Sequence, residues 1–79
     1  MKLLVRNLSR STTEQEIRIL FSAHGRVTEC TLVLDKETGL SKGFAFVEMP
    51  NDKEANVALT AIHHLRVAKN RVRVKIADS

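Results

Sequence analysis

The 79-residue sequence predicts an α+β fold: a four-stranded antiparallel sheet with two helices on one face, in the order βαββαβ. Four short segments alternate apolar and polar residues, which is typical of half-buried strands. Two further segments place apolar residues at helical spacing behind a residue suited to cap a helix. Helices that share one face leave the other face of the sheet open. We expect a single domain over residues 1–79, because a chain this short has room for one core.

The first predicted strand covers residues 2–7, "KLLVRN". Side chains alternate between the two faces of a strand, so Leu3 and Val5 share the face expected to pack against the helices. The open face then carries Lys2, Leu4 and Arg6.

The first helix is predicted within residues 11–25, "STTEQEIRILFSAHG". Thr13 and Glu16 have the spacing of a capping box, in which each side chain accepts a hydrogen bond from the other residue's backbone N–H. Gly25 stands where the helix is expected to end. One apolar stripe is expected to enter the core: Ile17, Leu20 and Phe21.

The second strand is predicted over residues 27–34, "VTECTLVL", and the loop that follows covers Asp35 to Ser41. Cys30 and Leu32 are expected to face the helices, since they alternate with more polar neighbours. The opposite face of this strand carries Glu29, Thr31 and Val33.

The third strand lies within residues 40–49, "LSKGFAFVEM". It places two of the three phenylalanines of the chain, Phe44 and Phe46, on the same face as Lys42. The opposite face carries small and aliphatic side chains, Gly43, Ala45 and Val47, and Met49 is expected to reach the core. This strand therefore sorts two large rings away from the helices.

The second helix is predicted after Pro50, within residues 51–65, "NDKEANVALTAIHHL". Either Asn51 or Asp52 is suited to be its N-cap. Its apolar stripe contains several small residues, which allow a helix to lie close to a sheet: Ala55, Ala58, Leu59 and Ile62.

The last strand is predicted over residues 71–77, "RVRVKIA", and completes the ferredoxin-like order. Its apolar side chains are expected to face the core: Val72, Val74 and Ile76. Its basic side chains are expected on the open face: Arg71, Arg73 and Lys75. Exposed rings beside cations suit unpaired bases and their phosphates, with stacking worth roughly 1–3 kcal/mol per base.

Two segments resemble the RNA recognition motif family. "KGFAFVEM" matches the octamer K/R-G-F/Y-G/A-F-V-x-F/Y at seven of eight positions, with Met49 in place of the final aromatic residue. "LLVRNL", residues 3–8, is similar to the family's hexamer, and "DKETGLSKGF" is similar to its loop before the third strand. The chain looks most like the small bacterial RNA-binding proteins that contain one such domain.

The resemblance implies that Phe44 and Phe46 contact base and sugar and that Lys42 neutralises phosphate. Leu4 stands where the family usually has a third stacking ring, so we expect modest affinity, weaker by about 5- to 150-fold. Lys69 stands where a turn glycine is common, and His63 and His64 replace the usual Asn-Gly, which leaves the geometry of the last hairpin open.

The predicted function is binding of single-stranded RNA on the open face, with single-stranded DNA not distinguished. Thr31 and Val33 are expected to line the far edge of the site. The complete predicted site comprises Lys2, Leu4, Arg6, Thr31, Val33, Lys42, Phe44, Phe46, Arg71, Arg73 and Lys75. No cofactor and no small-molecule substrate are expected, and a monomer is expected.

Two other function classes compete with this prediction. A protein-binding module would use the sheet or the helices; one such variety carries Arg-x-Phe before the last strand, whereas this chain has Arg66-Val67-Ala68. An enzyme of the same fold, such as an acyl phosphatase, needs a phosphate-binding loop, and nothing glycine-rich follows the first strand. The sequence therefore favours binding over catalysis.

Composition sets further expectations. Thirteen Lys and Arg against nine Asp and Glu give a formal charge of +4, which favours a polyanionic partner. Cys30 is the sole cysteine, so no intramolecular disulfide or cysteine-based zinc cluster is expected. His63 and His64 are neighbours expected to point to different sides of a helix end, and no metal site is predicted. No apolar run approaches the roughly 20 residues of a membrane span, and no signal peptide is seen, so a cytoplasmic location is expected.

Overall fold

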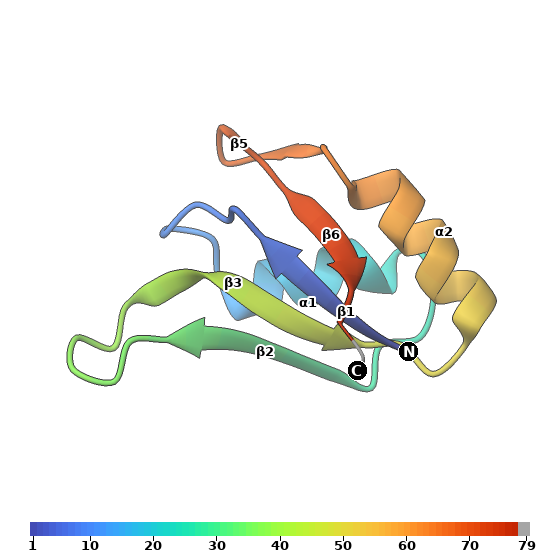
Figure 1. Ribbon diagram of the computed structural model, residues 1–79, viewed down its shortest axis with the longest axis horizontal. Coiled ribbons are helices and arrows are strands. Elements are labelled where there is room, and N and C mark those ends of the chain that lie inside the picture. Colours follow the sequence, from blue (N-terminus) through green and yellow to red (C-terminus); the bar gives the residue numbers. More distant parts are fainter. Residues whose placement is uncertain (78–79) are drawn as a thin grey trace.

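The computed structural model describes residues 1–77 and confirms the predicted α+β architecture (Figure 1). Its elements are β1 (Lys2–Arg6), α1 (Glu14–Ser22), β2 (Glu29–Leu34), β3 (Ser41–Glu48), α2 (Asp52–Ile62), β4 (Arg66–Val67), β5 (Asn70–Arg71) and β6 (Arg73–Ile76). The main sheet has four antiparallel strands in the order β2-β3-β1-β6, and both helices lie on the same side of it. The two central strands, β1 and β3, therefore carry both family-like segments side by side.

Both helices begin at the predicted capping residues. The Thr13 side chain accepts a hydrogen bond from the Glu16 backbone N–H at 3.1 Å, and Glu16 Oε1 accepts one from the Thr13 backbone N–H at 2.8 Å. At α2 the cap is Asn51, whose Oδ1 accepts from the backbone N–H of Glu54 at 3.0 Å. The first helix ends at Ser22, before Gly25, because the chain tightens into a turn in which the Gly25 N–H donates to the Ser22 carbonyl at 3.4 Å.

The core lies between the sheet and the helices. The sheet contributes alternate residues of each strand, as predicted: Leu3, Val5, Cys30, Ala45, Val47 and Val74. The helices contribute Ile17, Phe21, Ala55, Ala58 and Ile62. Each large apolar side chain removed from water in this way contributes roughly 1.5–3 kcal/mol. Burial of these side chains determines which face of the sheet packs against the helices, and the opposite face stays available for other contacts.

Cys30 packs into this core as expected, with its Sγ 3.7 Å from the carbonyl oxygen of Glu14. Burial raises the pKa of the Cys30 thiol, with opposing and smaller effects from the charges of Arg18 and Glu14. A buried thiol with a raised pKa carries little reactive thiolate, so Cys30 serves packing.

The predicted last strand, residues 71–77, is wrong in two respects. Val72 is buried, but its backbone N–H donates to Leu65 O at 2.9 Å and its carbonyl accepts from His64 N at 2.7 Å. Because Val72 pairs with the segment after α2, Arg71 belongs to β5 in a separate hairpin with β4 and not to the main sheet.

Ile76 is the second error, because 43% of this residue is exposed although it was predicted to face the core. It is the last residue of β6, an edge strand, and it pairs with Leu3 on one side only. An apolar side chain at the end of an edge strand lacks the neighbours that bury Val74 two residues earlier.

The two histidines after α2 do not point to different sides as predicted. Their rings stack with centroids 3.9 Å apart, since the left-handed backbone of His64, with φ at 72°, brings its side chain alongside that of His63. His63 Nδ1 also accepts a hydrogen bond from the backbone N–H of Val74 at 3.0 Å.

Across residues 1–77, no group of three or more metal-binding side chains comes together. Within the same range, neither helix has the length and apolar character of a membrane span.

Candidate nucleic-acid interface

The open face of the sheet is organised in rows that run across the strands. Phe46 lies between Thr31 on β2 and Leu4 on β1, and Leu4 is opposite Lys75 on β6. This row places one ring and one leucine at the centre of the sheet, with a polar residue and a cation at its edges. It forms the middle of the predicted site.

The next row contains the second ring. Val5 is opposite Ala45, so the following residues, Arg6 and Phe44, are neighbours across the same strand pair. Arg6 is in turn opposite Arg73 on β6. Both arginines are exposed, so two like charges are neighbours across this strand pair, an arrangement that is unfavourable unless an anion lies nearby.

The two phenylalanine rings form one platform. Their centroids are 6.2 Å apart and their planes meet at 86°, an edge-to-face geometry that is favourable for aromatic pairs. Both rings are half-buried on the face that the helices do not cover. Leu4, beside Phe46, is also half-buried, so an apolar strip runs along the centre of the open face.

Lys2 lies over one of these rings. Its Nζ is 5.1 Å from the centroid of Phe46, a cation–π contact worth about 0.5–1 kcal/mol at an exposed site. A base that stacks on this face of Phe46 must therefore displace the Lys2 ammonium.

Several acidic side chains accept hydrogen bonds from the backbone. Glu14 Oε2 accepts from the backbone N–H of Leu32 at 2.9 Å, and Glu54 Oε1 accepts from that of Arg26 at 3.1 Å. Asp35 Oδ1 accepts from the backbone N–H groups of Glu37 and Thr38. These backbone hydrogen bonds, that from Thr38 first, hold the pKa of the Asp35 carboxyl below its ordinary value, and the charge of Arg10 adds a smaller effect.

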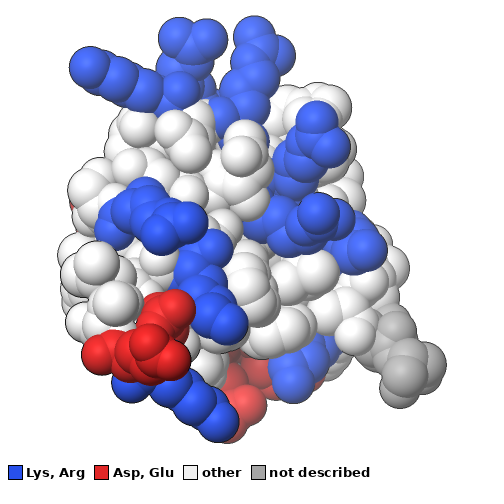
Figure 2. Space-filling view, turned by 60° about the vertical axis from the view of Figure 1, so that its left-hand side comes forward, with Lys and Arg blue, Asp and Glu red and all other residues white. Residues whose placement is uncertain are grey.

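Within the described part of the chain, the lysine and arginine side chains form no ion pairs. Over residues 1–77, the ion pairs are those of the Met1 amine, with Glu48 at 3.2 Å and Asp52 at 4.0 Å, and none involves a lysine or arginine side chain. Figure 2 brings the left-hand end of Figure 1 forward; Lys and Arg are spread over most of its surface, and Asp and Glu gather in the lower part. This end of the molecule can therefore attract a polyanion without first breaking internal pairs.

A pocket of about 660 Å³ lies beyond the Phe44 row. It is lined by residues 6–10, which lead from β1 toward α1, by residues 42–44 of β3, and by Asn70 of the hairpin. Sequence reasoning missed Asn7, Ser9, Arg10 and Asn70 as site residues. The one available signal was Asn7, which belongs to the hexamer-like segment "LLVRNL".

Three hydrogen bonds hold the pocket walls together. Asn7, which has a left-handed backbone with φ at 59°, donates from Nδ2 to the carbonyl of Arg71 at 2.8 Å. Asn70 donates from Nδ2 to the carbonyl of Asn7 at 3.3 Å. The backbone N–H of Leu8 donates to the carbonyl of Gly43 at 2.9 Å. Residues far apart in the chain are thus fixed around one hollow.

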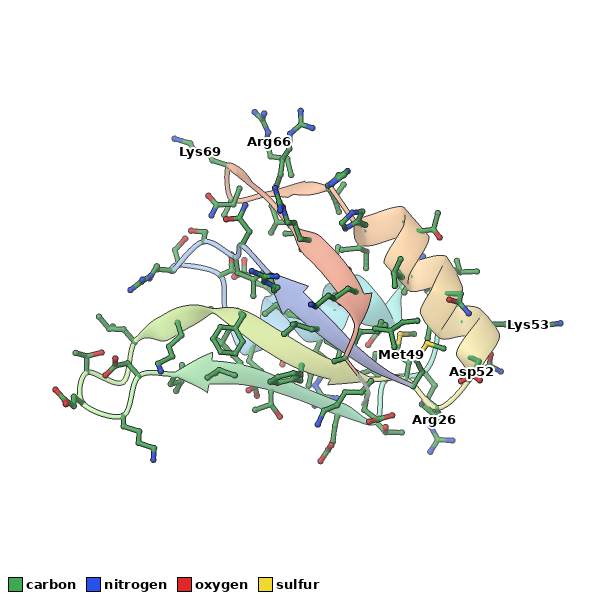
Figure 3. All side chains as sticks on the ribbon, in the orientation of Figure 1. Arg26, Met49, Asp52, Lys53, Arg66 and Lys69 are labelled. Carbon is green, nitrogen blue, oxygen red and sulfur yellow. The ribbon has the colours of Figure 1, made fainter. Side chains whose placement is uncertain are left out.

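The hairpin of β4 and β5 projects past the edge of the sheet. Val67 pairs with Asn70, and the two turn residues between them, Ala68 and Lys69, have positive φ of 50° and 74°. A two-residue turn of this kind normally uses glycine or asparagine, so little in the sequence indicates it. Arg66 and Lys69 extend from the hairpin into solvent (Figure 3). Arg71 is exposed on the same hairpin, away from the sheet row in which it was predicted.

The other predicted site residues lie on or beside the open face. The register of the strands brings together Lys2, Leu4, Arg6, Thr31, Phe46, Arg73 and Lys75. Val33 is half-buried on the edge strand β2, next to a shift in register between Leu32 and Leu34. Lys42 is exposed and lines the pocket together with Phe44.

Comparison with known proteins agrees with this geometry. The sequence matches the RNA recognition motif profile over residues 3–73. The chain belongs to the RNA recognition motif family. Among its relatives, the chloroplastic RNA-binding protein CP31B of Arabidopsis thaliana is 36% identical over 98% of this chain, which spans 27% of that protein. The putative RNA-binding protein RbpD of Nostoc sp. is also 36% identical over 98% of this chain, and here the chain spans 82% of the relative.

Solved structures with this motif have the same fold. The Sxl-lethal protein–RNA complex superposes with a TM-score of 0.94 and 29% identity, covering 99% of this chain and 47% of that one. In this chain the two family-like segments lie on the adjacent central strands β1 and β3.

Proposed function

We propose that this chain binds single-stranded RNA across the open face of its sheet and makes or breaks no covalent bond. One observation carries the proposal. Phe44 and Phe46 form a half-buried pair of rings on the face opposite the helices, beside arginine and lysine side chains that have no acidic partner within residues 1–77. Membership of the RNA recognition motif family and the names of the relatives support the same conclusion.

Each part of the site has a proposed role. Phe46 stacks one base after Lys2 has moved aside, and Phe44 contacts the neighbouring base or sugar. Leu4 supports the strip without offering a ring. The cations on or beside the sheet contact phosphates or base edges: Lys2, Arg6, Lys42, Arg73 and Lys75. Arg71 does so from the β4–β5 hairpin. Thr31 and Val33 form the far edge of the surface.

Affinity is expected to be modest and sensitive to salt. Leu4 replaces a third stacking ring, which removes roughly 1–3 kcal/mol of binding free energy. If four phosphates are neutralised, log K falls against log salt with a slope of about −2.8, or about 50-fold between about 50 and 200 mM. A slope near zero in fluorescence-anisotropy titrations would contradict the role of the cations.

Removal of the central ring is the direct test. Phe46→Ala is expected to weaken binding to a random-sequence RNA pool by about 5- to 150-fold, because one stacked base loses its support. Ile19→Ala is a matched control, since Ile19 is 61% exposed on α1, away from the sheet. Circular dichroism establishes that both variants fold. Unchanged titration curves for folded Phe46→Ala would defeat the proposal.

NMR titration separates RNA binding from the protein-binding alternative and from single-stranded DNA. Addition of RNA is expected to shift the backbone signals of β1 and β3, because those strands carry the rings. Shifts confined to α1 and α2 would contradict binding on the sheet, and the absence of any shift would favour the protein-binding alternative. A DNA pool of the same length, titrated in parallel, measures how far the 2′-hydroxyl contributes to affinity.

A further inference from the structure

The pocket beyond Phe44 differs in character from the platform beside it. The platform is a nearly flat apolar strip, whereas the pocket is a hollow of about 660 Å³, within the usual size range of small-molecule sites, about 300–1,000 Å³. Phe44 forms a wall of the pocket and is also half of the ring pair, so the two features are continuous. A strand that crosses the rings meets this hollow as it leaves the sheet.

Positive charge converges on the pocket from three segments. Arg6 comes from β1, Arg10 from the loop that follows it, and Lys42 from the start of β3. No carboxylate is among the described residues that line it, and the nearby Asp35 is already held by backbone N–H groups. Such a concentration of cations is stabilised by an anion that contacts several of them.

A second hollow continues the first. It measures about 210 Å³ and is lined by Arg6, Asn7 and Arg73. Arg6 and Arg73 are directly opposite on adjacent strands, and both are exposed residues that line this hollow. A phosphate seated here relieves the repulsion between their like charges and can accept hydrogen bonds from both forks.

We propose that the pocket binds one further nucleotide of the RNA strand, beyond those on the two rings. The phosphate lies among Arg6, Arg10 and Lys42, and the base enters the hollow against Phe44. Asn7 and Asn70 each use Nδ2 in holding the walls, and within the described residues the Oδ1 of neither accepts a hydrogen bond, so both oxygens can receive amino groups of a base. This inference rests on the proposed function and extends it past the edge of the sheet.

The walls of the pocket are held by hydrogen bonds within the chain itself. The hydrogen bonds from Asn7 to Arg71, from Asn70 to Asn7 and from Leu8 to Gly43 tie loop, hairpin and strand together. A nucleotide that enters a preformed hollow avoids the free-energy cost of ordering these segments. The added nucleotide should therefore increase affinity measurably and not merely extend the bound strand.

The test compares random-sequence RNA pools that increase in length by one nucleotide. For the wild-type chain, affinity is expected to rise by at least about 5-fold at the length that first reaches the pocket, the gain of one more base contact. Arg10→Ala is expected to retain the affinity for shorter pools and to lose most of this step. Arg26→Ala is the matched control: Arg26 is exposed, lies outside the pocket and is seen at the opposite end of the molecule from the hairpin (Figure 3).

The outcomes separate this inference from the proposed function. If Arg10→Ala shows the same step as wild type, or loses the same factor at every length, the pocket assignment is overturned while the platform stands. If wild-type protein binds no pool at all, the proposed function itself fails. NMR provides a second readout that needs no variant: the longer pool should newly shift the backbone signals of Ser9, Arg10 and Asn70, and unshifted signals would overturn the assignment.

Discussion

The two ends of the open face differ in the charges that adjacent strands bring together: acidic and basic residues meet at one end, and two arginines meet at the other. At the end marked by Lys2, Glu48 is directly opposite that lysine, and Glu29 is opposite Glu48. At the other end Arg6 is opposite Arg73, and the adjoining pocket adds Arg10 and Lys42 without a carboxylate in its described lining. The sheet face is thus graded from mixed to basic along its strands, and a bound strand should have its strongest phosphate contacts at the Arg6 end.

Charge reversal at each end is the most direct test of this difference in phosphate binding. Arg6→Glu is expected to weaken RNA binding by on the order of 10-fold or more at about 100 mM salt, since it removes a phosphate contact and adds repulsion. Lys2→Glu should cost less, because Lys2 already has Glu48 opposite it and must leave Phe46 before a base can stack. Anisotropy titrations at several salt concentrations measure both; equal losses at the two ends would contradict the gradient.

Gly43 lies between the ring pair and the pocket, and its role is tested by measuring the free energy of unfolding. Gly43 has φ at 86°, and a Cβ there would lie 3.3 Å from the carbonyl oxygen of Leu8. Gly43→Ala is therefore expected to lower the free energy of unfolding by about 1–3 kcal/mol. Gly39→Ala is the control, because Gly39 has φ at 73° and a Cβ there would meet no atom within 4 Å, so this variant carries the backbone strain alone. Urea unfolding should rank Gly43→Ala below Gly39→Ala; the reverse order would show that the close approach to Leu8 is unimportant.

Removal of an acidic group at the Lys2 end is expected to change RNA affinity by a smaller factor than the charge reversals at Arg6 and Lys2. Glu29→Gln is expected to strengthen RNA binding by about 2-fold at low salt, with the difference vanishing as screening increases. Glu29 suits this test because it is exposed on the edge strand β2 and makes no side-chain hydrogen bond in the described chain. A weaker complex would indicate that Glu29 receives a hydrogen bond from the RNA.

The smallest expected effect concerns Asp35, in the loop between β2 and β3 near Arg10. Its pKa is lowered in the folded chain by the N–H groups of Thr38 and Glu37, so the ionised carboxylate stabilises the fold above the ordinary pKa of 3.8. This contribution is lost as the pH falls through the lowered folded-state value. Asp35→Asn should therefore reduce the dependence of stability on pH below about pH 4. Thermal unfolding at several acidic pH values measures this dependence. If the melting temperatures of variant and wild type fall equally with pH, Asp35 makes no such contribution.

Much of the fold follows from local pattern. Alternation in "KLLVRN" and "LSKGFAFVEM" assigned Leu3, Val5, Ala45 and Val47 to the core, and the spacing of Thr13 and Glu16 located the start of α1. The same alternation failed at Arg71 and Ile76. Backbone pairing of Val72 with Leu65 and His64 detaches Arg71 from the sheet, and pairing partners are not encoded in the alternation itself.

The pocket was beyond the reach of sequence pattern for a related reason. Asn7 and Arg71 are joined by a hydrogen bond although 64 positions separate them, and Asn70 reaches Asn7 across 63. The hairpin turn that positions Asn70 uses Ala68 and Lys69 at positive φ, where glycine would have marked it. Contacts between distant loops depend on the assembled sheet, so the rings were visible in the sequence and the hollow beside them was not.

The ammonium of Lys2 lies above Phe46, and its position has a consequence that we expect for contacts between two copies of the chain. An uncovered aromatic strip invites a second copy to press its own strip against it, burying both from water. When two such strips approach, the Lys2 ammonium groups of the two copies are brought together while water between them is excluded, so their repulsion increases. We therefore expect the Lys2 ammonium to oppose self-association, and a nucleic acid to overcome this opposition because its phosphates can pair with the displaced ammonium.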